Sequence, residues 1–502
     1  MKYIQFFIPG ILSSLLFACN FSNSSQPLSG PLTFDPKDFS HESLVLTEGD
    51  TIFYKAYKDL TYVENVEDSV YQKLNIFIPD SVIDNAPILL RTYIGGYMAS
   101  KPQDPRADDA TGYALKEGYV VCIPGSRGAN SFVTNDDGYQ KYTGKAPNAL
   151  LDLKAAVRYL RRNGPNIPAS TDRIFVDGTS AGGAMAALLG STGNCDLYED
   201  ELTRMGTANE KDDVYAVISY CPITDLNHAD MEYEWLYGCT NKGARHLDEA
   251  QIAISNELAS LCPDYIDSLF LRNQNGEYLT TATYKTFLKS FLIASAQKAI
   301  DSGLEIHDEM GYVFTKPDKA TNTDKEPARY KGKEKKDSDD IRIIKKGDVI
   351  TDLNLDKYLE YIAREHQLKT PPAFDQWMVL IPVPSPENQV FGTIEGEPAN
   401  FTEFSLRHHL HDSKAKLSEE MDSRVKMMNP MDFIGLDIST ISQYWYIRHG
   451  AKDRDTSFLV PINLATKLEN NEYEVNFFIP WDRPHSGDYD LDDLFEWIEQ
   501  IR

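Results

Sequence analysis

Several patterns that would indicate metal or nucleotide chemistry are missing from this chain of 502 residues. Its six cysteines include no C-x-x-C spacing, so a structural zinc site has no support. Neither a P-loop nor a G-x-G-x-x-G fingerprint after an opening strand is present. No repeat of fixed period is visible, which argues against a propeller. We therefore expect a protein that works without a metal or cofactor.

Positive charge is scarce. The chain has 50 Lys and Arg against 76 Asp and Glu, a net charge of −26. Phosphate backbones would repel such a protein, so we expect no nucleic-acid partner. Hydrophobic residues make up 42% and charged residues 25%, as in globular proteins and unlike disordered ones.

The N-terminal apolar stretch at residues 3–18 is shorter than the roughly 20 residues that a transmembrane helix needs. With Lys2 before it and Ala18 at its end, it is typical of a secretory signal. Cys19 directly after Ala18 resembles the lipobox of bacterial lipoproteins, which implies that Cys19 is acylated. We predict a signal peptide at 1–19, a tether at 20–40 and a mature protein anchored on the extracytoplasmic side of a membrane. The alternative is a plain signal peptide with a chance cysteine.

Short apolar runs alternate with helical patterns over much of the chain. Runs bounded by Gly, Pro or Asp predict strands at 74–79, 87–95, 119–124, 173–177 and 214–221. An apolar face with helical spacing predicts a helix at 148–163. The rhythm stops after about residue 222 and resumes at 444 with strand, helix, strand and helix at 444–450, 458–470, 475–480 and 491–501. This alternation indicates an α/β fold with a mostly parallel sheet, helices on both faces and a large insertion.

A glycine-flanked serine gives the strongest chemical signal. The sequence Gly178-Thr-Ser-Ala-Gly182 is a G-x-S-x-G motif between a predicted strand and a small-residue helix at 184–190. A serine hydroxyl is a poor nucleophile and must be presented on a strained turn within reach of a histidine. The N–H of Ala181, near a helix N-terminus, would stabilise the developing oxyanion. We predict that Ser180 is the nucleophile of an α/β-hydrolase; the alternative is a structural turn with an incidental serine.

In this fold the nucleophile is followed by the acid and then by the base. His485 comes after the last predicted strand and is the only histidine beyond residue 449, so we predict it as the base. The preceding strand is followed by Asp453, the predicted acid, with Asp455 two residues further on. His449 precedes the acid, and we interpret it as a packing or loop residue.

A second oxyanion donor is expected in a loop after an earlier strand. Gly95 and Gly96 follow the run at 87–92 and either lend an N–H or only turn the chain. The order of segments predicts a hydrolase core in two parts, 41–225 and 431–502, around a mainly helical cap at 226–430. Within the cap, the hydrophilic run at 316–340 is interpreted as a solvated surface loop because its charges alternate in sign.

Three segments at 178–184, 452–457 and 480–489 together resemble bacterial tannases (tannin acyl hydrolases). The likeness spans about residues 70–502 and is weaker through the cap. Fungal tannases and their feruloyl-esterase relatives place cysteines beside the triad Asp and His. Here those neighbours are Lys452 and Pro484, so the bacterial type is the better match.

The resemblance implies hydrolysis of galloyl esters, such as gallates and hydrolysable tannins, through an acyl-enzyme on Ser180. It also implies that Asp455, with Lys369 and Glu387 from the cap, binds the phenolic hydroxyls; each could instead be a surface charge. Two other functions stay open: a feruloyl or general carboxylesterase of the same fold, and a surface lipoprotein that binds polyphenols without turning them over.

Overall fold

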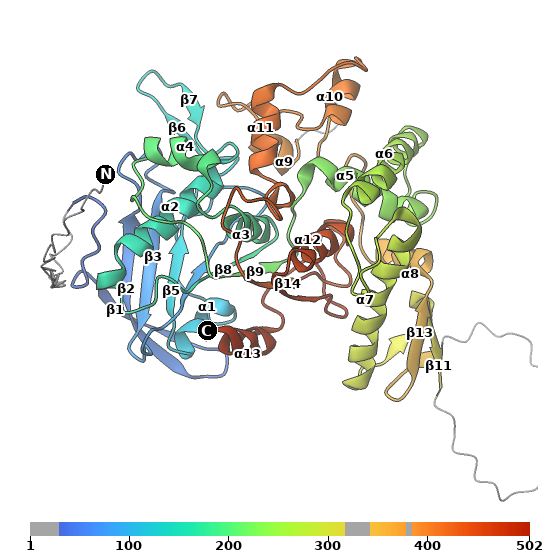
Figure 1. The fold of residues 1–502 in the computed structure, drawn as a ribbon, viewed down its shortest axis with the longest axis horizontal. Coiled ribbons are helices and arrows are strands. Elements are labelled where there is room, and N and C mark those ends of the chain that lie inside the picture. Colours follow the sequence, from blue (N-terminus) through green and yellow to red (C-terminus); the bar gives the residue numbers. More distant parts are fainter. Residues whose placement is uncertain (1–29, 317–341, 378–383) are drawn as a thin grey trace, which may run out of the picture.

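The protein is described by a computed structural model that covers residues 30–316, 342–377 and 384–502 (Figure 1). The predicted signal peptide with Cys19, residues 20–29 of the tether and residues 317–340 of the hydrophilic run lie outside the described residues. Within the described ranges, no helix combines the length and the apolar character that crossing a membrane would require.

A single nine-stranded sheet forms the core, in the order β1-β2-β3-β5-β4-β8-β9-β14-β15. Pairs from β5 to β15 are parallel, and the three pairs from β1 to β5 are antiparallel, so the prediction of a mostly parallel sheet is confirmed. The strands are β1 Ser40–Val45, β2 Thr51–Thr61, β3 Lys73–Pro79, β5 Val120–Pro124, β4 Ile88–Arg91, β8 Ile174–Thr179, β9 Ala216–Tyr220, β14 Tyr444–Arg448 and β15 Glu474–Phe478.

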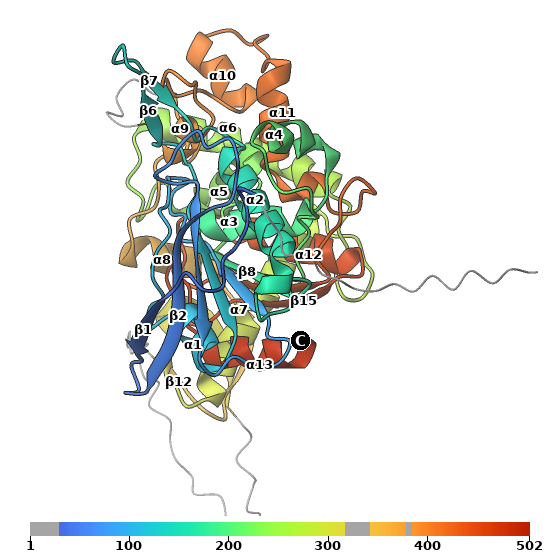
Figure 2. The same ribbon diagram turned by 90° about the vertical axis from the view of Figure 1, so that its left-hand side faces the viewer.

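Side chains alternate across the sheet and build a core on each face. Leu89 and Phe175 pack with α1 and α13, whereas Leu90 and Val176 pack with α2, α3 and α12 (Figures 1 and 2). Because the central strands are buried on both faces, their sequences read as continuous apolar runs. These helices are α1 Ala110–Lys116, α2 Asn148–Arg162, α3 Ala181–Ser191, α12 Leu459–Asn470 and α13 Leu491–Ile501.

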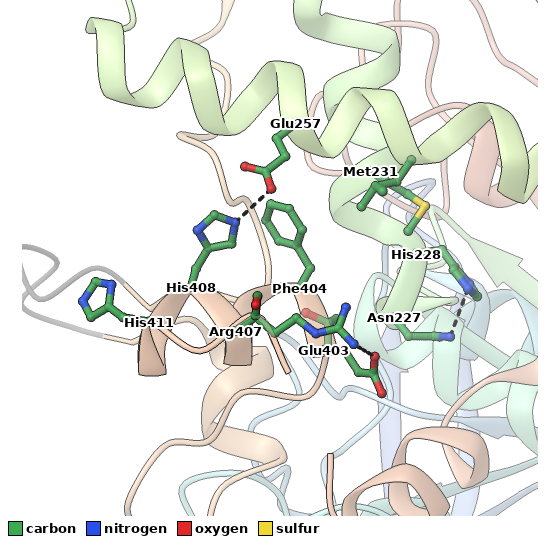
Figure 3. Close-up of a pocket in the computed structure, with 12 residues that line it drawn as sticks. Asn227, His228, Met231, Glu257, Glu403, Phe404, Arg407, His408 and His411 are labelled. Atoms are coloured by element: carbon green, nitrogen blue, oxygen red, sulfur yellow. Dashed lines mark hydrogen bonds and ion pairs between the residues drawn. The ribbon is translucent and has the colours of Figure 1, made fainter. Parts of the chain in front are cut away.

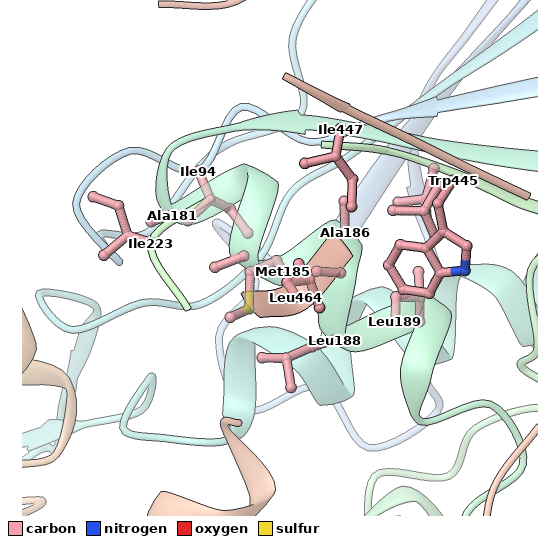
Figure 4. Packing of buried hydrophobic residues seen from close by; sticks show 14 of the residues in the cluster. Ile94, Ala181, Met185, Ala186, Leu188, Leu189, Ile223, Trp445, Ile447 and Leu464 are labelled. Carbon is pink, nitrogen blue, oxygen red and sulfur yellow. The ribbon is translucent and has the colours of Figure 1, made fainter. Parts of the chain in front are cut away.

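Helix α3 lies unusually close to the sheet. Its small residues allow this approach, since a Cβ at Gly190 would lie 2.2 Å from Cγ2 of Val217 on β9. Met185, Ala186 and Leu189 belong to the same buried cluster as Trp445 and Ile447 of β14 (Figure 4). The start of α3 is thereby held rigidly at the end of β8.

The cap is the segment between β9 and β14, residues 226–430. As predicted, its flanking strands are neighbours: Val217 pairs with Trp445 in parallel register. The exact division at 225 and 430 stays a prediction. The cap helices are α5 Leu226–Tyr237, α6 Glu249–Ser268, α7 Thr281–Asp301, α8 Leu355–Glu365, α9 Pro386–Val390, α10 Glu403–Leu410 and α11 Glu419–Met427.

Small β elements were not anticipated from the sequence. In the cap, β10 Ile306–His307 pairs with β12 Ile343–Ile344, and β11 Tyr312–Thr315 pairs with β13 Val349–Leu353. In the core, β6 Phe132–Thr134 and β7 Gln140–Tyr142 form a hairpin. The core also contains the short helix α4, Glu199–Arg204. The run at 87–95 is a strand only at Ile88–Arg91, because the chain turns at Gly96 and Tyr97, whose φ angles are 54° and 57°.

Candidate active site

Ser180 occupies the sharp turn between β8 and α3. Its φ of 63° and ψ of −125° are strained for a residue with a side chain. A Cβ at Gly178 would lie 2.3 Å from the carbonyl oxygen of Gly182, so only glycine permits this close approach. The Ser180 N–H donates to the Tyr220 carbonyl at 2.9 Å and ties the turn to β9. The serine is thus held at the carboxyl end of the central strands.

The surroundings of Ser180 supply backbone N–H groups. Ala181 is the first residue of α3, and the first N–H groups of a helix have no intrahelical acceptor. The loop after β4 packs on this helix start, since a Cβ at Gly182 would lie 3.0 Å from the Ile94 carbonyl oxygen. Gly95 and Gly96 belong to the same loop, the region from which a second oxyanion donor would come.

Asp453 and His485 follow β14 and β15 and form a hydrogen-bonded pair. His485 Nδ1 lies 2.8 Å from Asp453 Oδ2. The other oxygen of Asp453 accepts the Asp455 N–H at 2.9 Å, and the Asp453 side chain is fully buried. The two loops are pressed together, because a Cβ at Gly450 would lie 2.2 Å from the Arg483 carbonyl oxygen.

The charges in this pair are set by their neighbours. Burial alone would raise the pKa of Asp453, but the charge of His449 and the hydrogen bond from His485 lower it well below its ordinary value. Burial alone would lower the pKa of His485, but the hydrogen bond to Asp453 and the charge of Asp455 raise it. An ionised carboxylate therefore orients an imidazole whose Nε2 is free to exchange a proton.

The loop that carries His485 also touches the serine turn. A Cβ at Gly487 would lie 2.1 Å from Oγ1 of Thr179, and Thr179 is the residue just before Ser180. On the same loop, the Ser486 carbonyl accepts a hydrogen bond from the Cys221 thiol at 3.2 Å. Ser180, His485 and Asp453 therefore lie on turns that meet at one end of the sheet, in an arrangement suited to acyl transfer.

The residues suggested for phenol binding come near this pair. Glu387, on α9, is only 4% exposed; burial raises its pKa, and the charge of Lys369 opposes that rise. The charge of Asp455 also raises the pKa of Glu387. The Asp455 carboxylate lies 3.9 Å from His485 Nδ1. The ammonium of Lys369 lies 4.1 Å above the Phe374 ring. The charges of Asp455, Glu387 and Lys369 are thus close enough to act on one another, and those of Asp455 and Lys369 act on His485.

Three cap tyrosines that sequence reasoning missed hold the loop that carries Asp453. Tyr233 and Tyr237 lie on α5 and Tyr358 on α8, and all three are buried. Their hydroxyls donate to backbone carbonyls at 2.8, 3.1 and 2.6 Å; the acceptors are Arg454, Asp453 and Ala451, respectively. Tyr233 and Tyr237 are four residues apart, so the sequence indicates that they lie on one face of a helix. It does not indicate what that face contacts.

The backbone of Lys369 is fixed from two sides. Its N–H donates to the Tyr233 hydroxyl at 3.0 Å, and its carbonyl accepts from Arg245 Nε at 2.9 Å. Arg245 forms a buried ion pair with Glu234 at 2.6 Å. No sequence pattern predicts the ion pair between Glu234 and Arg245, because the two residues lie on different segments of the cap.

His449 is a packing residue, as interpreted from the sequence, but it also faces the acid. Its ring meets Phe458 edge-on at 5.2 Å between centroids, and its Nδ1 lies 3.5 Å from Asp453 Oδ2. Neither ring nitrogen has a hydrogen-bond partner among the described residues. Two groups of three residues are close enough together to hold a metal ion. One consists of Cys221, His449 and Asp453, and the other of Asp453, Asp455 and His485.

Solved structures similar to this chain include tannases. The tannin acyl hydrolase from Lactobacillus plantarum is 33% identical, with a TM-score of 0.79, over 94% of this chain and 98% of that one. A Fusobacterium nucleatum tannase is 34% identical, with a TM-score of 0.77, over 94% and 99%. A tannin acyl hydrolase in complex with ethyl gallate is 33% identical, with a TM-score of 0.78, over 94% and 98%.

Esterases match shorter stretches. The family described as BD-FAE matches residues 74–263. The para-nitrobenzyl esterase of Bacillus subtilis (strain 168) is 28% identical over 30% of each chain. The human cocaine esterase is 24% identical over 52% of this chain and 48% of its own. The chain thus spans less than half the length of the curated esterases it matches.

Proposed function

Because the chain belongs to the tannase family and is a tannase-like carboxylic ester hydrolase of α/β-hydrolase fold, we propose that it cleaves galloyl esters with Ser180, Asp453 and His485 as its catalytic triad. The observation that carries the proposal is the 2.8 Å hydrogen bond between His485 and Asp453, beside a serine in a strained turn. The similar structure that holds ethyl gallate supports the choice of acyl group.

In the first half of the reaction, Ser180 Oγ attacks the ester carbonyl carbon while His485 takes its proton. The N–H of Ala181, with Gly95 or Gly96, stabilises the oxyanion of the tetrahedral intermediate. Collapse breaks the bond to the alcohol oxygen, and His485 returns the proton to the leaving alcohol. The product is a galloyl-enzyme on Ser180.

In the second half, His485 takes a proton from water, and the water oxygen attacks the acyl carbon. Collapse releases gallate, and Ser180 Oγ recovers its proton from His485. Asp453 stays ionised throughout and stabilises the imidazolium, as its lowered pKa requires.

We propose that Asp455, Lys369 and Glu387 bind the ring hydroxyls of the galloyl group. Their mutual influence on pKa values supports a common site. A pocket built to hydrogen-bond hydroxyls rejects a ring that lacks them by roughly 10⁴ or more, because its own polar groups would be left unpaired. Such a site would distinguish gallate from benzoate.

The test uses the protein without residues 1–20, methyl gallate and methyl benzoate, and a Ser180→Ala variant. We expect release of gallate that depends on Ser180, with benzoate esters almost untouched. Equal cleavage of both esters would favour a general carboxylesterase, and binding of gallate without any cleavage would favour a polyphenol-binding protein.

We also propose that the protein is a secreted lipoprotein, anchored on the extracytoplasmic side of a membrane through an acyl group on Cys19. The support is the sequence around residues 2–19. Labelled palmitate should enter the full chain expressed in a bacterium and should not enter a Cys19→Ala variant. A native chain that is cleaved and released without label would instead have a plain signal peptide.

A further inference from the structure

The cap holds a pocket of about 740 Å³ that none of the predicted site residues lines. It lies between α5 and α6 on one side and α10 with its flanking loops on the other (Figure 3). Its volume falls in the range that binds small molecules, roughly 300–1,000 Å³. Its lining includes Asn227, His228, Glu257, Phe404, Arg407 and His408.

One wall of the pocket is aromatic. The imidazole of His408 stacks on Trp377, with centroids 4.9 Å apart and planes 19° apart, and its centroid lies 4.5 Å from that of Phe404. Met231 and Leu261 add aliphatic surface to the lining of the pocket. Flat rings packed in this way present faces on which another ring can stack.

A buried network fixes His228 at one end of the pocket. Its Nδ1 lies 2.7 Å from the buried Asp225 carboxylate, and its ring stacks on Tyr265 with centroids 3.8 Å apart. Asn429 also donates to Asp225, at 2.8 Å. His228 Nε2 lies 3.4 Å from the amide nitrogen of Asn227, so an imidazole and an amide that are held in place form this polar end of the pocket (Figure 3).

The opposite end carries charged groups. Glu257 lies 3.3 Å from His408 Nε2, and Arg407 pairs with Glu403. Donors and acceptors therefore line a space with aromatic and aliphatic walls. This chemistry suits a ring with several hydroxyls, because each hydroxyl both donates and accepts a hydrogen bond.

Both walls are built on segments that also carry the candidate active site. Helix α5 begins just after Ile223, whose N–H lies 3.5 Å from the Ser180 carbonyl oxygen. On the other side, Thr402 at the start of α10 donates to Asp375 at 2.7 Å, and Asp375 accepts from Asn388, the neighbour of Glu387, at 2.8 Å. The pocket and the candidate site are thus connected through hydrogen-bonded segments on both sides of the pocket.

We infer that this pocket binds a second hydroxylated ring of a large ester while one galloyl group is held at Ser180. The inference rests on the proposed function and extends it to the part of the substrate that does not react. The second ring is either another galloyl group or the sugar that carries the esters, since both offer several hydroxyls.

The test compares KM for methyl gallate and for pentagalloyl glucose in a Phe404→Ala variant. Leu410→Ala is the matched control, because Leu410 lies on the same helix, is 56% exposed and does not line the pocket. We expect KM for pentagalloyl glucose to rise about tenfold in Phe404→Ala, with KM for methyl gallate unchanged. An equal rise for both esters, or for neither, would overturn the inference.

A Glu257→Gln variant provides a second probe on α6, should Phe404→Ala fold poorly; the same selective rise is expected. Binding of pentagalloyl glucose to the Ser180→Ala protein separates this inference from the proposed function. It should weaken when Phe404→Ala is added, even if the native protein were to cleave no galloyl ester. Gallic acid that competes more strongly in the Ser180→Ala protein than in the Ser180→Ala/Phe404→Ala protein would identify a galloyl ring at this pocket, and glucose that does so would identify a sugar; no difference for either would reject the site.

Discussion

Tyr233 and Lys369 are joined by a hydrogen bond in which the Lys369 backbone N–H donates to the Tyr233 hydroxyl at 3.0 Å. The same hydroxyl donates to the Arg454 carbonyl at 2.8 Å, between Asp453 and Asp455. One cap side chain therefore connects the segment proposed to bind the phenol ring with the loop that carries the proposed acid. The cap is part of the site and not only a cover over it.

Replacing Tyr233 by Phe should raise KM for methyl gallate about tenfold, because a buried N–H that loses its acceptor costs about 1–3 kcal/mol. The kcat should fall as well, since the carbonyl of Arg454 loses its donor. A matched control is Tyr358→Phe, whose hydroxyl donates to Ala451. That variant should lower kcat and leave KM unchanged; identical effects of both variants would refute the connection through Lys369.

Substituting Asn for either aspartate separates their roles. Asp453→Asn should lower kcat by roughly 10⁴, because the base loses the carboxylate that sets its tautomer and stabilises its charge. Asp455→Asn should keep kcat within about tenfold and mainly raise KM for methyl gallate, as expected when one hydrogen bond to the substrate is lost. Steady-state kinetics on methyl gallate measure both. The reverse result would make Asp455 the acid.

The pH dependence should follow the deprotonation of His485, which must be neutral to accept the serine proton. Its pKa is raised in the folded protein, so kcat/KM should rise with pH through a midpoint above the ordinary value of about 6.5. Asp455→Asn removes one of the negative charges that raise this pKa, and its midpoint should lie at lower pH. A non-phenolic ester such as p-nitrophenyl acetate isolates this effect from phenol binding. A midpoint that stays fixed or moves upward would contradict the electrostatic account.

Gly487→Ala should impair catalysis more than stability. Its Cβ would lie 2.1 Å from Thr179 Oγ1, so the loop of His485 would be pushed away from the serine turn. A displacement of about 1 Å can cost about 10²-fold in kcat. Gly238→Ala is the control, because its Cβ would meet no atom closer than 3.9 Å. Urea unfolding and kcat on p-nitrophenyl acetate, measured for both variants, show whether the loss is catalytic.

Glu387→Gln and Lys369→Met should each raise KM for methyl gallate by about 10-fold or more, through unpaired polar groups in a buried site. At a pH well above the pKa of His485, where the charge of Lys369 no longer affects its protonation, neither should change hydrolysis of p-nitrophenyl acetate. Because the charge of Lys369 acts on Glu387, the double variant should cost less than the sum of the single ones. Strict additivity would indicate that the two residues do not share a site.

Much of the fold could be predicted from local pattern. Helix α13 begins and ends where its apolar periodicity does, and α2 differs from the prediction by one residue. Strands β1 and β2 were not predicted, because their half-exposed residues give no continuous apolar run. Strand β4 is shorter than its apolar run, because the chain turns at Gly96 and Tyr97 and leaves the sheet.

By itself, the sequence determined the fold class and the candidates for the site. A G-x-S-x-G motif between strand and helix, followed by an acid and a base after later strands, depends on chain order and local geometry, which are written along the chain. Only the tertiary structure decided how the cap completes that site. The contacts of Tyr233 with Lys369 and Arg454, and the pocket between α5, α6 and α10, join residues far apart in the sequence. Such contacts arise when separate segments pack together, and no local pattern of residue types specifies which segments will meet.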